Sequence, residues 1–289
     1  MCGIFGVITN GRKKPDMGAL RALTLANRER GKEALGFFNS EREIFKQAVD
    51  PIDLLADSDC TDYLDRSEQS SWFIVGHTRY STRGANVDAN AHPFEYGNII
   101  GSHNGIIDAP HNYTVDSQYL IDMLNCHDSN YQEALANDWG YWTTAWHDRA
   151  KDELFLSMHD NSCGLVKYRG AWYFSSDPDH LASSLGVRDT IVMKSGDTVS
   201  FGNDGQLKWR KKFETNMSYS YKRDYRTNGG SSKKSSSTTT AIYPAYSGTT
   251  ATQDYSGVND PDGTIKDYDA EFQTMWAEYA NEYDGVGGS

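Results

Sequence analysis

The sequence lacks the features of a membrane or secreted protein. No stretch of its 289 residues approaches the roughly 18 consecutive apolar residues that a membrane-spanning helix needs. The N-terminus lacks the basic start and long apolar core of a signal peptide, because polar residues begin at Thr9. We therefore expect a soluble protein of a reducing, cytoplasmic compartment, without membrane association.

Cysteine is scarce, and motifs for metals or nucleotides are missing. The four cysteines form neither a CxxC pair nor a Cys/His set with the spacing of a metal site. Neither GxxxxGKS/T nor GxGxxG occurs, and no internal repeat is visible. The sequence thus predicts no metal and no cofactor, and three of the cysteines are expected to be ordinary thiols: Cys60, Cys126 and Cys163.

Charge and composition divide the chain into three parts. Residues 1–215 have the pattern of a compact domain. Residues 216–262 are rich in Ser, Thr, Gly and Tyr, which predicts a flexible linker because few side chains are available to form a core. Much of the net charge of −12 lies in the acidic segment 263–289 and the residues just before it.

The linker and the acidic segment each suggest a partner. A basic cluster at 222–234 can contact nucleic acid, but no base-reading motif accompanies it, so we expect a solvated linker and no nucleic-acid partner. Aromatic residues recur at helical spacing from Tyr268 to Tyr283, which predicts a short helix in 263–289. Docking on the chain's own domain and binding of a partner protein are equally open for this helix.

The first 215 residues alternate between strand and helix patterns. Short β-type runs are bounded by Gly, Asn, Asp or Ser, at 3–8, 71–78, 97–105, 141–148, 152–159, 171–176, 190–194 and 197–201. One helix is expected at 16–30, capped by Asp16 and buried through a face that includes Leu25, and another at 116–126, capped by Asp116. This order predicts an α+β fold with two stacked antiparallel sheets covered by helices.

The N-terminal MCGIFGV places a cysteine where it can be highly reactive. If Met1 is removed, Cys2 carries a thiol and a free α-amine, and its small side chain permits that removal. The amine, with a pKa near ~7.7–8.0, can serve as a general base for the thiol. Cys2 is therefore a candidate nucleophile.

Three later segments place polar groups next to predicted strands. Arg79 in GHTRYSTRG follows an apolar strand, so its guanidinium requires a carboxylate from the protein or from a ligand. The pair Asn104–Gly105 in GSHNGII is typical of a tight turn, but its two N–H groups also suit an oxyanion hole. Asp116 is either a helix cap or an ammonium-binding group. One cation and one anion together suit a free amino acid.

Six motifs in this order carry a resemblance: MCGIFGV, RGKEALG, GHTRYSTRG, AHPF, GSHNGII and VDSQ. Over about residues 2–205 the chain resembles the class II glutamine amidotransferase domain, as in glucosamine-6-phosphate synthase and amidophosphoribosyltransferase. That family belongs to the N-terminal nucleophile hydrolases. The resemblance implies a four-layer αββα sandwich of two antiparallel sheets.

The resemblance also implies roles for individual residues. Cys2 would form a γ-glutamyl thioester and release ammonia, with its α-amine as base, while Asn104 and Gly105 would form the oxyanion hole. The α-carboxylate of glutamine would be bound by Arg79, helped by Thr82, and its α-ammonium by Asp116. Arg30 matches a family loop near the site, as a substrate-binding candidate.

Two departures from the family stand out. Arg83 takes the place of a small residue or His after HTRYST, and the acidic loop between Phe45 and Ser71 has no counterpart. In the sequence, only the linker and the aromatic segment follow residue 215. We therefore expect a glutaminase that forms glutamate and ammonia for a separate synthetase or ligase, which the C-terminal helix could recruit if it does not dock on its own domain. The alternatives are a stand-alone hydrolase of a γ-glutamyl amide, suggested by AHPF, and a non-catalytic binding protein.

Overall fold

The computed structural model describes residues 2–127, 130–136 and 140–210. The predicted linker at 216–262 and the predicted helix in 263–289 lie outside these residues. Among the described residues, no helix has both the length and the apolar character needed to cross a membrane.

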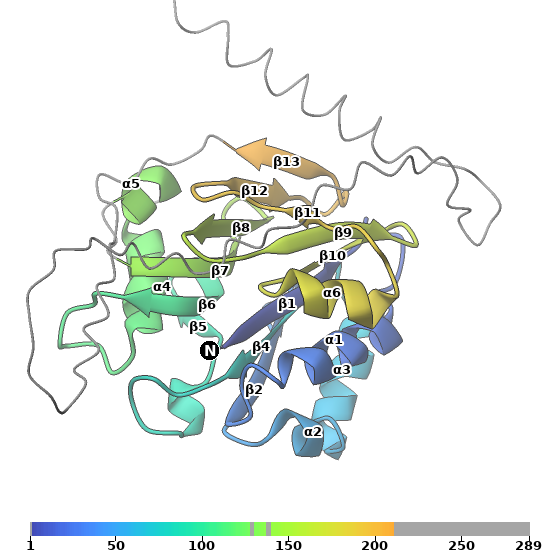
Figure 1. Ribbon diagram of the computed structural model, residues 1–289, viewed down its shortest axis with the longest axis horizontal. Helices are drawn as coiled ribbons and strands as arrows, with labels where there is room; N and C mark the ends of the chain where they lie inside the picture. The colour runs from blue at the N-terminus through green and yellow to red at the C-terminus, as the bar shows by residue number, and fades with distance from the viewer. Residues whose placement is uncertain (1, 128–129, 137–139, 211–289) are drawn as a thin grey trace, which may run out of the picture. The chain divides into compact units, whose positions relative to one another are not determined.

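Two antiparallel sheets form the centre of the described domain (Figure 1). The seven-stranded sheet runs in the order β11 (Ile191–Val192), β9 (Gly164–Tyr168), β10 (Ala171–Ser175), β1 (Gly3–Ile8), β4 (Phe73–Arg79), β2 (Ala34–Asn39) and β3 (Ile44–Gln47). The six-stranded sheet runs β13 (Leu207–Arg210), β12 (Thr198–Phe201), β8 (Glu153–His159), β7 (Gly140–Asp148), β6 (Ile99–Ile107) and β5 (Phe94–Tyr96). The strand β1 therefore lies in the middle of its sheet, between β10 and β4.

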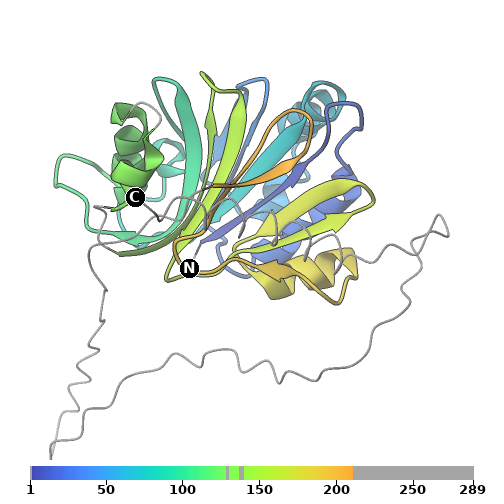
Figure 2. The same ribbon diagram turned by 90° about the horizontal axis from the view of Figure 1, so that it is seen from above.

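Helices cover the outer face of each sheet, so that Figure 2 shows four layers. The seven-stranded sheet is covered by α1 (Met17–Asn27), α2 (Pro51–Leu54), α3 (Ser58–Ser70) and α6 (Pro178–Leu185). The six-stranded sheet is covered by α4 (Asp116–Cys126) and α5 (Tyr131–Ala136). A short 3₁₀ helix, η1 (Asp88–Asn90), precedes β5. The predicted α+β class and the four-layer αββα sandwich are confirmed.

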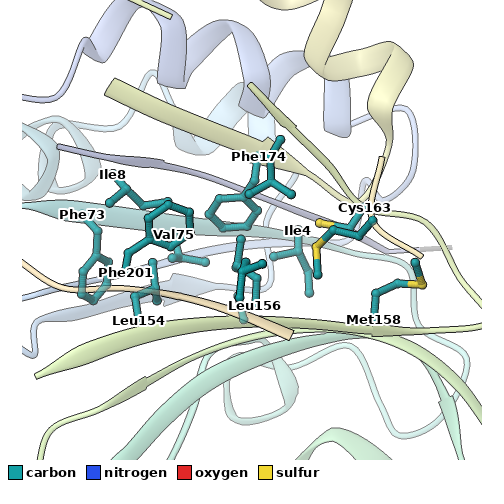
Figure 3. Close-up of a cluster of buried hydrophobic side chains, with 14 of the residues drawn as sticks. Ile4, Ile8, Phe73, Val75, Leu154, Leu156, Met158, Cys163, Phe174 and Phe201 are labelled. Atoms are coloured by element: carbon teal, nitrogen blue, oxygen red, sulfur yellow. The ribbon is translucent and has the colours of Figure 1, made fainter. Parts of the chain in front are cut away.

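The main core lies between the two sheets (Figure 3). Successive residues of a strand point to opposite faces. In β1, Ile4 and Ile8 accordingly face the other sheet, whereas Phe5 and Val7 face the helices. The same alternation in β4, β8 and β12 supplies further inner side chains: Phe73, Val75, Leu154, Leu156, Val199 and Phe201. Strand alternation thus decides which residues can reach the space between the sheets.

The two predicted helices exist, but some of their details were wrong. Asp16 caps α1 as expected, accepting a hydrogen bond from Ala19 N at 3.0 Å. Leu25 is 44% exposed, because it lies two residues, and so about 200° around the helix, from the buried Leu23. Asp116 is the first residue of α4 and not its cap, which is Val115.

The acidic segment between Phe45 and Ser71 is not a loop, as the sequence suggested, because it folds into α2 and α3. Two of its acidic residues cap these helices: Asp50 accepts from Ile52 N at 3.0 Å, and Asp57 from Asp59 N at 2.8 Å. The side chains that α3 buries are Cys60, Tyr63, Leu64 and Ser67, at helical spacing. The remaining charges lie on the solvent face, which obscured the helical pattern.

Candidate active site

Cys2 lies at the N-terminal end of β1, directly before the central strand of its sheet. Cys2 lies an even number of residues from Ile4 and Ile8, so its side chain is on the same side of the sheet, facing the second sheet. The Tyr80 amide donates a hydrogen bond to Cys2 Sγ at 3.4 Å, and the thiol lies 3.5 Å from the Tyr80 carbonyl oxygen. Burial raises the pKa of the Cys2 thiol, whereas the hydrogen bond to Tyr80 opposes that shift.

Arg30 fixes the backbone of Cys2. Its Nε donates to the Cys2 carbonyl oxygen at 2.8 Å, and its Nη1 forms an ion pair with Asp177 at 2.8 Å. Asp177 is itself anchored, as the N-cap of α6. Arg30 therefore acts on the backbone of Cys2 in this structure, and its contact with a substrate stays a prediction.

Removing the contact between Arg30 and Cys2 is expected to displace Cys2. Arg30→Met leaves the Cys2 carbonyl without its donor and Asp177 without its ion pair, so we expect kcat/KM for a substrate that reacts at Cys2 to fall about 10- to 100-fold. The matched control is Arg66→Met, because Arg66 is 60% exposed and lies 3.8 Å from Glu43. Equal kinetics for the two variants would contradict a positioning role for Arg30.

Arg79 is the last residue of β4 and is only 3% exposed. Its guanidinium donates to the carbonyl oxygens of Arg83 at 2.9 Å and Ala85 at 3.3 Å, so the loop after β4 wraps around it. Within the described ranges no carboxylate lies within ion-pair distance of this charge. Thr82, the other predicted carboxylate contact, is exposed on the same loop.

Asn104 and Gly105 lie inside strand β6, so the tight turn that the pair suggested does not form. Asn104 is 2% exposed, and its buried Nδ2 has no hydrogen-bond partner in the part of the chain that the structure describes. Gly105 has φ +154°, and a Cβ there would lie 2.0 Å from the Tyr141 carbonyl oxygen. Only glycine fits this position.

Asp116 opens α4 and is 8% exposed. Its carboxylate accepts hydrogen bonds from the Ile107 and Ser117 amides, each at 3.0 Å. Among the described residues, no lysine or arginine forms an ion pair with it. Its charge raises the pKa of the Cys2 thiol, and that of Arg79 lowers it, so both charges lie near Cys2.

The structure also shows supporting residues that the sequence did not reveal. Glu33 accepts a hydrogen bond from Ser81 N at 2.6 Å and so fixes the loop after β4. Asn161 Nδ2 donates to the Asn104 carbonyl oxygen at 2.9 Å. Asp177 had a usable signal, since an acidic residue before a proline often begins a helix. No local pattern marks Glu33 or Asn161.

Three buried histidines, His77, His92 and His103, lie close together next to the candidate site residues in the chain. His77 Nε2 contacts the His103 carbonyl oxygen at 3.1 Å, the rings of His77 and His92 lie 3.7 Å apart, and His103 Nδ1 contacts Ser117 Oγ at 2.9 Å. Burial lowers the pKa of His77 to about 3 and also lowers the pKa values of His92 and His103. No group of His, Cys, Asp and Glu within the described segments is arranged to hold a metal ion.

These histidines predict acid sensitivity of the fold. Their folded pKa values lie below the unfolded value of ~6.5, so the unfolded state binds more protons and stability falls as pH drops below ~6.5. Each histidine lowers the free energy of unfolding by up to about 1.4 kcal/mol for each pH unit of acidification. Urea unfolding between about pH 7.5 and pH 5.5 measures this slope.

His92→Phe is expected to reduce that slope, because neither ring nitrogen of His92 has a hydrogen-bond partner within the described residues. The exposed His111 provides the control variant His111→Gln, which should leave the slope unchanged. An unaltered slope in His92→Phe would show that other groups cause the acid sensitivity.

Two stacked antiparallel sheets between helices, with a cysteine directly before a central strand, are the arrangement of the N-terminal nucleophile hydrolase fold. The chain is 38% identical over 237 residues to glutamine–fructose-6-phosphate aminotransferase (isomerizing) of Campylobacter jejuni, an alignment that covers 72% of this chain and 37% of that protein. It is 35% identical over 109 residues to amidophosphoribosyltransferase of Rhizobium etli, covering 36% of this chain and 21% of that protein.

A solved structure shares the fold at low identity. Glutamine phosphoribosylpyrophosphate amidotransferase from B. subtilis, complexed with ADP and GMP, aligns with a TM-score of 0.58 and 13% identity over 75% of this chain and 50% of that chain. No protein-family model matches the chain. The predicted resemblance is confirmed: the described domain is related to the class II glutamine amidotransferase domain. The chain spans well under half the length of these curated relatives.

Proposed function

We propose that this chain is a glutaminase that hydrolyses the side-chain amide of L-glutamine through a thioester on Cys2. The observation that carries the proposal is a set of buried polar groups that, in the part of the chain that the structure describes, lack a counter-charge or an acceptor: Arg79, Asp116 and Asn104. Within the described residues, Arg79 lacks a carboxylate, Asp116 lacks a base and Asn104 Nδ2 lacks an acceptor. Burying such groups is costly unless a ligand supplies the missing partners. Glutamine carries a complementary group for each.

The two charged groups bind the amino-acid end of the substrate. Arg79 takes the α-carboxylate, with Thr82 beside it on the loop, and Asp116 takes the α-ammonium. Binding at two points orients the side-chain amide towards Cys2 and so reduces the entropy that the reaction must lose.

The chemical steps need only this chain and water. Cys2 Sγ attacks the amide carbon while the thiol proton passes to the α-amine of Cys2, exposed by loss of Met1. The resulting oxyanion accepts hydrogen bonds from Asn104 Nδ2 and Gly105 N. The C–N bond then breaks, the nitrogen takes the proton and leaves as ammonia, and a water molecule hydrolyses the thioester to glutamate.

The direct test combines intact mass with product release. Purified protein whose mass shows that Met1 is absent should form equal amounts of glutamate and ammonia from L-glutamine. L-asparagine, which is one methylene shorter, is the matched negative substrate, because its amide does not reach Cys2 when its α-groups are bound. Absence of glutamate from protein with a free Cys2 amine would refute the proposal.

We also propose that the ammonia passes to an acceptor enzyme, since both curated relatives are named as transferases. The competing role is hydrolysis of a larger γ-glutamyl amide for its own sake. Comparing kcat/KM for L-glutamine with that for γ-glutamyl amides of increasing size separates the two. A preference for free glutamine supports the amidotransferase role, and a preference for a larger amide supports the hydrolase.

A further inference from the structure

Arg83 is the residue at which the loop after β4 departs from the family pattern, and the structure shows where its side chain goes. Its guanidinium is half-buried and donates to three backbone carbonyl oxygens of one segment: Ala109 at 3.4 Å, Pro110 at 3.4 Å and Tyr113 at 2.9 Å. A planar guanidinium with five N–H donors can serve several carbonyls at once, whereas a lysine ammonium is a compact point donor. Arg83 thus connects the loop after β4 with the segment before α4.

The backbone of Arg83 is hydrogen-bonded to Arg79, the first of the two predicted ligand-binding charges. Its carbonyl oxygen accepts the 2.9 Å hydrogen bond from Arg79 Nη2. The rest of the loop is fixed around the same guanidinium, because Ser81 Oγ donates to the Gly84 carbonyl oxygen at 2.9 Å and Asn90 Nδ2 donates to that of Ala85 at 2.9 Å. Arg79 and the backbone of Arg83 therefore hold a fixed geometry.

The side chain of Arg83 connects, through the segment before α4, to Asp116, the second predicted ligand-binding charge. Tyr113, which accepts from Arg83, is held to α4 by its hydroxyl group, which donates to Asp122 at 2.6 Å. Gln118 Oε1 accepts from the Thr114 amide at 3.2 Å. These contacts fasten the segment to the first turns of α4, where Asp116 lies. A continuous set of hydrogen bonds thus runs from Arg79 through Arg83 to the start of α4.

We infer that Arg83 is a specificity-determining positioning residue, which fixes the spacing between Arg79 and Asp116 and so selects ligands that carry both an α-carboxylate and an α-ammonium. The inference rests on the proposed function for the nature of the ligand. Loss of the connection weakens a ligand bound at both points more than one bound at Arg79 alone, because only the former depends on the spacing.

The role of Arg83 is tested by measuring ligand binding to the Cys2→Ala protein by calorimetry, because this protein binds the ligand without turning it over. The ligands are L-glutamine and glutaramate, which has the same amide and carboxylate but no α-ammonium. In the Cys2→Ala background, Arg83→Lys should weaken glutamine binding about 10- to 100-fold and glutaramate binding far less. Arg66→Lys, an exposed arginine on α3, is the matched control and should change neither dissociation constant.

Folding and function are separated by two further measurements. Arg83→Gln, which keeps a neutral donor, should show the same loss of selectivity if Arg83→Lys proves unstable, and urea unfolding identifies the folded variants. Equal weakening of both ligands, or no binding of glutamine to the Cys2→Ala protein, would overturn the inference. If Cys2→Ala binds glutamine with the expected selectivity but wild-type protein releases no glutamate, the proposed function fails while the role of Arg83 stands.

Discussion

Replacing Cys2 by alanine is expected to abolish glutamate release from glutamine. The thiol is the group that attacks the amide in the proposed reaction, and without it only water remains as a nucleophile for that step. Removal of a catalytic nucleophile typically lowers kcat by roughly 10⁴- to 10⁶-fold, so activity should fall to the background of the assay. Steady-state measurement of glutamate, with the unfolding midpoint recorded in parallel, checks the result.

The matched control is Cys126→Ala, which removes another thiol of the same chain. Cys126 is exposed at the end of α4, and Cys60 and Cys163 are buried in hydrophobic clusters, where burial raises the pKa values of their thiols to about 11 and about 12. None of the three is placed to react with glutamine in the proposed site. Retention of most activity by Cys2→Ala, or its loss in Cys126→Ala, would contradict the assignment of the nucleophile.

The fold and the location of the site follow from short-range patterns in the sequence. Short runs of β-type residues bounded by Gly, Asn, Asp or Ser predict the strands. Within β1, the side to which Ile4 and Ile8 point is also the side on which Cys2 lies. Gly31, next to Arg30 in the motif RGKEALG, illustrates how a motif reflects packing. A Cβ at Gly31 would lie 2.4 Å from the Arg79 carbonyl carbon, so the two motifs must touch.

The residues that support the site were not predictable in the same way. Arg30 and Asp177 are 147 positions apart in the chain, and Asn104 and Asn161 are 57 apart, so their contacts depend on the assembled sheets and on no local pattern. The segment 45–71 was misjudged for a related reason. Its acidic residues serve as caps and as a solvent-facing surface, and their function appears only once the helices have a sheet to cover.

Asn104→Ala is expected to produce the second largest loss of activity, which should appear as a lower kcat with little change in KM. If Asn104 Nδ2 binds the oxyanion, its hydrogen bond is strongest in the transition state, and removing one such donor costs about 10²- to 10³-fold in rate. KM should change little, because the α-carboxylate and α-ammonium are bound elsewhere. The free-energy cost to folding should be small, because Nδ2 has no partner to lose among the residues that the structure describes.

A lower kcat with an unchanged free energy of unfolding distinguishes a catalytic role of Asn104 from a structural one. Asn104→Asp keeps the shape of the side chain but replaces the donor by a negative charge that repels the oxyanion, so it should be at least as inactive as Asn104→Ala. Asn98→Ala, at an exposed asparagine just before the same strand, should behave as wild type in both kcat and stability. If Asn104→Ala lowers the free energy of unfolding in parallel with activity, the side chain stabilises the fold. That result would contradict the proposal that the Asn104 amide binds the oxyanion.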